Sequence, residues 1–156
     1  MRRAALAALA AMAAIAAVAA WLAFPRGDSA SAGGLRPDDA DLVREGMSVY
    51  AGHCAACHGA RLEGQATWRQ RKPDGRLPAP PHDATGHTWH HPDETLIRLT
   101  MQGPQSVAGA DYASDMPAYE GILDRRQVVA VLSYIKSTWP ADIRERHDAI
   151  NAQAKP

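Results

Sequence analysis

The sequence of 156 residues predicts a small, mostly α-helical domain of three to five helices joined by long loops. Apolar residues recur at helical spacing in two stretches, residues 39–50 and 124–139. Between residues 59 and 92, glycine and proline are too frequent to allow a long regular element. The 17 Lys and Arg residues balance the 17 Asp and Glu residues, so the overall charge gives no indication of nucleic-acid binding.

Residues 1–27 carry the features of a membrane anchor. Two arginines, Arg2 and Arg3, precede an uncharged run from Ala4 to Phe24, which is long enough to cross the hydrocarbon core of a bilayer. Arginines at this end favour an N-terminus in the cytoplasm. A cleaved signal peptide is the alternative, because Ala30-Ser31-Ala32 fits the small-residue cleavage rule. Either way, we expect the rest of the chain on the periplasmic side of a bacterial inner membrane.

A linker follows, since residues 28–37 are rich in Ser, Ala and Gly. We expect the globular domain at residues 38–140 and a C-terminal tail at residues 141–156. The first helix of the domain begins near Asp39, and one face of it is marked by Leu42, Val43, Gly46, Val49 and Tyr50. A glycine inside a helix is unfavourable, so Gly46 suggests the close approach of a second helix.

This helix leads directly into Cys54-Ala55-Ala56-Cys57-His58, which contains both cysteines of the chain. Two cysteines three residues apart, with a histidine behind the second, form the attachment signature of a c-type haem. On one helical turn the two thiols can form thioethers with two vinyl groups of one porphyrin, and His58 can ligate the iron. A redox dithiol or half of a zinc site is the alternative, but a dithiol has no need of the adjacent histidine, and a zinc site needs further ligands at suitable spacing.

Gly46, Tyr50 and residues 54–59 together resemble the N-terminal helix and haem site of class I cytochromes c. This family of single-haem bacterial proteins includes membrane-anchored and periplasmic domains. The resemblance implies a cytochrome c-like haem domain with one covalently attached haem c. It also implies that Gly46 and Tyr50 cross the C-terminal helix near Tyr134.

The loop after the motif holds two further candidate features. The first is a group of basic residues beside Trp68, namely Arg69, Arg71, Lys72 and Arg76. This group is either a docking patch for an acidic redox partner or a solvated loop surface. The second is Pro80-Pro81. In class I cytochromes c, the haem-ligating histidine donates its other ring N–H to a proline carbonyl, and the resemblance leaves both Pro80 and Pro81 as candidates.

Four histidines and a tryptophan follow within ten residues: His82, His87, Trp89, His90 and His91. Trp89 and one histidine can line the haem edge as hydrogen-bond donors. Alternatively, the imidazoles bind a separate copper, nickel or zinc ion, or form a plain exposed loop. The stretch resembles a Gly-His-x-Trp-His-His segment of bacterial monohaem cytochromes, some of which accompany membrane dehydrogenases. A histidine could also replace methionine as the distal ligand.

Two more helices complete the domain. Pro92-Asp93-Glu94 opens a short one, expected over Thr95–Gln102 with Leu96, Leu99 and Met101 in the core. Asp124 is a suitable N-cap for the last one, which runs to about Trp139 and carries the apolar stripe Val128, Val131, Leu132, Ile135 and Trp139. After Pro140 we expect at most a short, loose helix.

Met116-Pro117 lies in irregular chain between these two helices. Class I cytochromes c supply the distal thioether ligand from this part of the chain, so the resemblance implies that His58 and Met116 are the axial ligands. The rival methionines are less suitable, because Met47 precedes the motif on the same helix, Met101 has a place in the core, and Met12 belongs to the anchor.

These features predict one-electron transfer rather than catalysis. The sequence has no phosphate-binding glycine loop, nucleophile elbow or zinc protease motif. A six-coordinate iron leaves no open position for a substrate. We expect a dehydrogenase, a cytochrome complex or a terminal oxidase as partner, and no nucleic acid. The alternatives are a copper-handling haem protein that uses the His82–His91 cluster, and a haem enzyme or gas sensor with a labile Met116.

Overall fold

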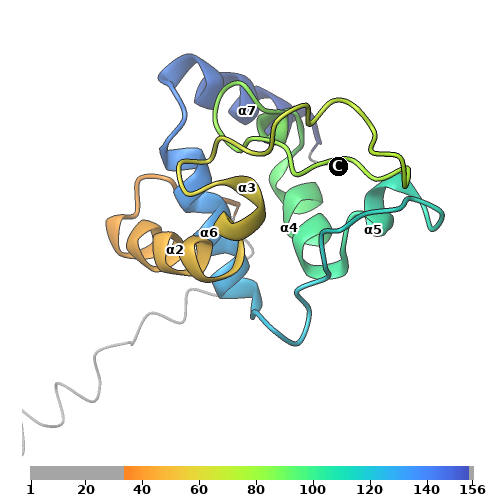
Figure 1. Cartoon of the computed structure of the whole chain (residues 1–156). Helices are drawn as coiled ribbons and strands as arrows, with labels where there is room; N and C mark the ends of the chain where they lie inside the picture. Colours follow the sequence, from red (N-terminus) through yellow and green to blue (C-terminus); the bar gives the residue numbers. More distant parts are fainter. Residues whose placement is uncertain (1–33, 155–156) are drawn as a thin grey trace, which may run out of the picture. The chain divides into compact units, whose positions relative to one another are not determined.

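The structure is a computed structural model that describes residues 34–154. In this range the chain is mostly helical, as predicted, and its β-pairing is one isolated bridge between Glu120 and Leu123. The helices are α2 (Ala40–His53), α3 (Ala55–His58), the 3₁₀ helix η1 (Thr88–His90), α4 (Asp93–Gln102), α5 (Gln105–Ala108), α6 (Arg125–Ser137) and α7 (Ala141–Ala154) (Figure 1). Of these, α3 and α5 are single turns of four residues.

The predicted anchor at residues 1–27 lies outside the described residues, as does most of the predicted linker. Within residues 34–154, none of the helices has the length and apolar character needed to span a bilayer.

Helices α2 and α6 cross in close contact at Gly46. A Cβ atom added at Gly46 would lie 2.0 Å from the carbonyl oxygen of Ala130 and 2.9 Å from the Cβ atom of Tyr134. One helical turn further along α2, the rings of Tyr50 and Tyr134 pack with their centroids 5.6 Å apart. The glycine therefore permits a backbone-to-backbone contact that any side chain would prevent.

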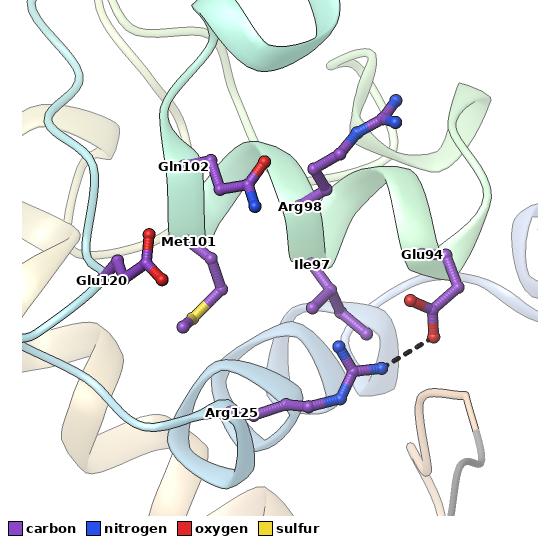
Figure 2. A pocket seen from close by; sticks show the side chains of 7 residues that line it. All are labelled: Glu94, Ile97, Arg98, Met101, Gln102, Glu120 and Arg125. Atoms are coloured by element: carbon purple, nitrogen blue, oxygen red, sulfur yellow. Dashed lines mark hydrogen bonds and ion pairs between the residues drawn. The ribbon is translucent and has the colours of Figure 1, made fainter.

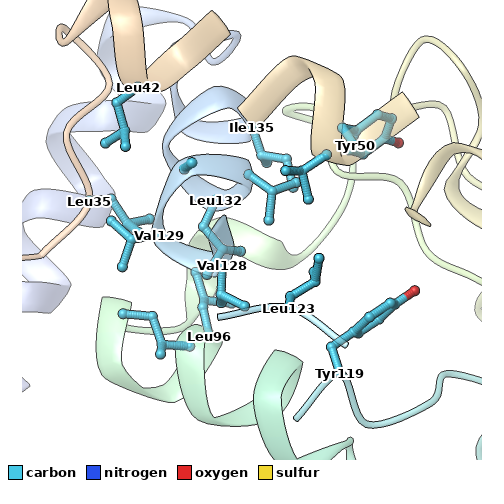
Figure 3. Close-up of a cluster of buried hydrophobic side chains, with 14 of the residues drawn as sticks. Leu35, Leu42, Tyr50, Leu96, Tyr119, Leu123, Val128, Val129, Leu132 and Ile135 are labelled. Atoms are coloured by element: carbon cyan, nitrogen blue, oxygen red, sulfur yellow. The ribbon is translucent and has the colours of Figure 1, made fainter. Parts of the chain in front are cut away.

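The hydrophobic core surrounds α6, whose apolar stripe lies between side chains of α2 and α4 (Figure 3). The side chain of Asp124 accepts from the backbone N–H of Gln127, and the side chain of Gln127 bonds back to Asp124, so α6 begins with a complete capping box. The buried hydrophobic residues that form the core are Leu35, Leu42, Val49, Tyr50, Leu62, Leu96, Ile97, Tyr119, Leu123, Val128, Val129, Ala130, Val131, Leu132, Ile135, Trp139 and Ile143.

The long loop after α3 folds back on the Cys54–His58 turn. The backbone N–H of Gln65 donates to the Ala79 carbonyl over 2.9 Å, and that of His82 donates to the Leu62 carbonyl over 2.8 Å. Gly64 makes this approach possible, because its φ of 68° suits glycine and a Cβ atom there would lie 2.4 Å from the nitrogen of Pro81. The loop therefore returns residues 79–82 to the side of the cysteine–histidine turn.

Helix α7 is longer and more closely packed than the short, loose helix expected after Pro140. Its His147 side chain is fully buried, with Nε2 3.0 Å from the His91 carbonyl and 3.4 Å from the Asp93 carboxylate. The Asn151 side chain accepts from the backbone N–H of Asp93 over 2.7 Å and donates to its carboxylate over 3.0 Å. The Trp139 ring meets the His147 ring edge to face. These contacts attach α7 to the start of α4.

His147 is held as a neutral imidazole in this position. Burial lowers its pKa, and the charge of Lys136 lowers it further, whereas Asp93, the His91 carbonyl and Asp148 act in the opposite direction. A neutral ring with the proton on Nε2 donates to the His91 carbonyl and leaves Nδ1 as an acceptor. In the unfolded chain, His147 regains an ordinary pKa near 6.5.

We therefore expect His147 to make the folded protein less stable as the pH falls from about 7.5 to about 5.5, because the unfolded chain takes up a proton before the folded protein does. The fall in urea midpoint over this range, followed by circular dichroism, should be smaller in His147→Gln, which has no titrating group there. Equal falls in the wild type and the variant would contradict this expectation.

Candidate functional site

The cysteine–histidine turn continues the helical path of α2. The N–H of Cys54 donates to the Tyr50 carbonyl, and the N–H of His58 donates to the Cys54 carbonyl, each over 2.9 Å. The two cysteines form no disulfide with each other, and Cys54 is partly buried whereas Cys57 is exposed. Two thiols and an imidazole are thus presented from a single helical turn, the arrangement that covalent attachment of a haem requires.

The surroundings of Cys54 fit a thioether anchor better than a redox dithiol. Burial and, to a smaller extent, the neighbouring Cys57 together raise the pKa of the Cys54 thiol to about 11. A redox dithiol or a thiolate metal site works through a cysteine of lowered pKa, next to positive groups. The Cys54 thiol is instead protonated at neutral pH.

His58 is buried, with 7% of its surface exposed, and its ring is oriented by a backbone carbonyl. Its Nδ1–H donates to the Pro80 carbonyl over 2.8 Å, so Pro80 rather than Pro81 is its hydrogen-bond partner. Burial lowers the pKa of His58, against the opposing effect of this hydrogen bond. Within residues 34–154, Nε2 makes no hydrogen bond. The neutral ring therefore keeps the Nε2 lone pair for a metal, as an oriented histidine ligand does.

The segment that contains Met116 is attached to the same region. Tyr119, three residues later, donates its hydroxyl to the His53 carbonyl over 2.7 Å, directly before Cys54. Asp115 forms ion pairs with Lys72 at 2.5 Å and with Arg76 at 3.3 Å. Met116 itself is partly buried against the core. These contacts join the Met116 segment to both the end of α2 and the loop after the motif.

The rival methionines in the described part of the chain lie elsewhere. Met47 is half exposed on α2. Met101 lines an open hollow of about 310 Å³ beside α4, and its side chain points toward the start of α6 (Figure 2). An ion pair of 2.8 Å between Glu94 and Arg125 lies at one end of this hollow. No residue of the cysteine–histidine turn lines it.

Trp89 and the histidines around it make separate local contacts. Trp89 is half-buried, stacks on His90 with centroids 3.7 Å apart, and donates its indole N–H to the Ala84 carbonyl over 3.3 Å. His87 and His91 face each other with their Nε2 atoms 3.2 Å apart. In residues 34–154, no group of three or more His, Cys, Asp or Glu side chains is placed to hold a metal ion.

His82 differs in its contacts from the other three histidines of this stretch. Its ring stacks on the ring of His58, with centroids 4.0 Å apart and an interplanar angle of 23°. Burial lowers its pKa well below the usual value, so the ring is neutral. The sequence pattern does not indicate this contact, because its spacing places His82 in one group with the other three histidines. The position of His82 directly after Pro80-Pro81 is the sequence feature that could have indicated its contact with His58.

The basic residues of the loop are occupied by local partners. Lys72 and Arg76 pair with Asp115, as described above, and the guanidinium of Arg69 lies 4.1 Å from the centroid of the Trp68 ring. The guanidinium of Arg71 donates to the Gly75 carbonyl. The predicted docking role of this group remains a prediction.

Two comparisons with known proteins give matches to this chain. The family model described as Cytochrome c matches residues 43–139. The gluconate 2-dehydrogenase cytochrome c subunit of Pantoea cypripedii is 32% identical over 105 residues, which cover 64% of this chain and 21% of that protein. The chain thus spans about a fifth of the length of this curated relative. No solved structure matches the chain significantly.

Proposed function

The chain belongs to the cytochrome c family and carries a covalently bound haem c, and on this premise we propose that it transfers single electrons with His58 and Met116 as axial ligands. The haem supplies the one-electron change between ferric and ferrous iron. The observation that carries the proposal is the buried His58 ring, whose Nδ1–H is held by Pro80 while Nε2 is left available.

Each residue of the site has one role in this proposal. Cys54 and Cys57 form the two thioethers. The Pro80 carbonyl fixes the tautomer of His58 and increases the basicity of Nε2. Met116 supplies the second axial ligand, which raises the reduction potential and closes the iron to exogenous ligands. The residues thereby favour an electron carrier over an enzyme.

We further propose that the partner is a dehydrogenase on the periplasmic side of the inner membrane. The support is the named relative, a dehydrogenase cytochrome c subunit, together with the anchor-like sequence of residues 1–27. The partner's substrate does not follow from this likeness, because the chain covers only a fifth of that relative.

Replacement of both cysteines tests the attachment. In a host with a c-type maturation system, the wild-type protein should retain haem through denaturing electrophoresis, whereas Cys54→Ser/Cys57→Ser should retain none. Ser48→Ala, on the exposed part of α2, is the matched control and should stain like the wild type. Retention of haem by the double variant would contradict covalent attachment at these positions.

Carbon monoxide distinguishes the electron carrier from a haem enzyme or gas sensor. The reduced wild-type protein should not bind carbon monoxide at neutral pH, because two protein ligands occupy the iron. Rapid binding would favour the alternative with a labile Met116. The copper-handling alternative rests, within the described residues, on the facing pair His87 and His91 alone.

A further inference from the structure

The rings of His58 and His82 form a stacked pair at the candidate site. The two rings face each other with centroids 4.0 Å apart. His82 follows Pro80, whose carbonyl accepts from His58, by two residues. The backbone N–H of His82 donates to the Leu62 carbonyl, and this bond holds His82 beside His58. One short segment therefore contacts the proposed iron ligand twice, once at Nδ1 and once at the ring face.

His82 is itself held firmly from several sides. Its Nδ1 lies 2.7 Å from the Thr88 hydroxyl, on η1. Its backbone carbonyl accepts from the indole N–H of Trp139, two residues beyond α6, over 2.7 Å. The Tyr50 ring of α2 meets it edge to face, with centroids 6.2 Å apart. The ring is thus held by Thr88 and Tyr50 and its backbone by Trp139, so it offers a fixed surface to its neighbour.

This surface limits the motion that an axial ligand retains. An imidazole bound through Nε2 can still rotate about the metal–nitrogen bond, and the single hydrogen bond at Nδ1 restrains this rotation only at the ring edge. A parallel ring against its face opposes the same rotation, because turning would drive His58 into His82. The plane of an axial imidazole sets the asymmetry of the ligand field at the iron.

We propose that His82 is a positioning residue that fixes the plane of the His58 ring by face-to-face stacking and is locked in place by Thr88. This inference rests on the proposed function, since it requires His58 to be an iron ligand. It assigns to the histidine-rich stretch a role that is independent of any second metal.

The test compares ferric, haem-loaded variants by electron paramagnetic resonance and by the spread of haem methyl shifts in proton NMR. His82→Leu should move the largest g value and change the methyl spread, because an aliphatic side chain offers no flat face. His82→Phe keeps a flat ring but loses the bond to Thr88, so it should move both signals less than His82→Leu does. His90→Leu is the matched control, since its exposed ring stacks on Trp89 instead.

Unchanged spectra in His82→Leu would overturn the proposal, and so would a change in His82→Phe as large as that in His82→Leu. If the His82 variants do not load haem, Thr88→Val replaces them and should move the same two signals. An unchanged Thr88→Val would then count against the proposal. A wild-type spectrum without a low-spin, six-coordinate ferric iron would instead contradict the proposed function itself.

Discussion

Gly46→Ala should destabilise the protein by about 3 kcal/mol or more, a large effect for the addition of one methyl group. The added Cβ would lie 2.0 Å from the Ala130 carbonyl oxygen, so α2 and α6 must separate. Because the obstacle is backbone, no change of rotamer can relieve it. Urea unfolding of the haem-loaded protein and the yield of loaded protein both measure the loss.

Gly52→Ala is the matched control in the same helix. A Cβ atom at Gly52 meets nothing within 4 Å, so the replacement should stabilise the protein by up to about 1 kcal/mol through helix propensity alone. Equal stability of the two alanine variants would show that the crossing at Gly46 does not limit the approach of the helices.

Met116→Ala should abolish the methionine-to-iron charge-transfer band of the ferric protein and lower its reduction potential. The expected effect on the band is complete, because a methyl group cannot coordinate iron. Loss of the Met116 side chain also removes the contribution that a Met/His ligand pair makes to a high reduction potential. A visible spectrum and a redox titration of the loaded protein measure the two effects, and binding of carbon monoxide to the reduced variant should appear with them.

Met101→Leu is the matched control for the ligand assignment. It replaces a partly buried methionine beside α4 with an apolar side chain of similar volume, so the band should persist. Loss of the band in Met101→Leu, with retention in Met116→Ala, would overturn the assignment. Met47→Leu, on the exposed side of α2, should leave the spectrum unchanged.

The long helices could be predicted from the sequence because their signals are local. Asp124 caps α6 through Gln127, three residues away, and the apolar stripe of α6 recurs within single turns. Asp39 caps α2 in the same way through Leu42. The cysteine–histidine turn is equally local, since its spacing alone places two thiols and an imidazole on adjacent helical positions.

Other parts of the structure could not be predicted, because they depend on residues far apart in the chain. Helix α7 has a weak apolar pattern, and its attachment depends on His147 and Asn151 meeting the start of α4, more than 50 residues earlier. The contact of Tyr119 with the His53 carbonyl links segments 66 residues apart. Neither pairing leaves a periodic signal.

By itself, the sequence predicted that a c-type haem is attached through Cys54 and Cys57 with His58 as an iron ligand, because covalent chemistry on one helical turn needs only short-range spacing. It left Pro80 and Pro81 equivalent, and it left His82 among four similar histidines. Only the tertiary structure decided between them. The returning loop, closed by hydrogen bonds to Leu62 and Ala79, brings one carbonyl and one imidazole to the His58 ring. Loop closure over some 20 residues is a property of the whole packed domain, so no local pattern encodes it.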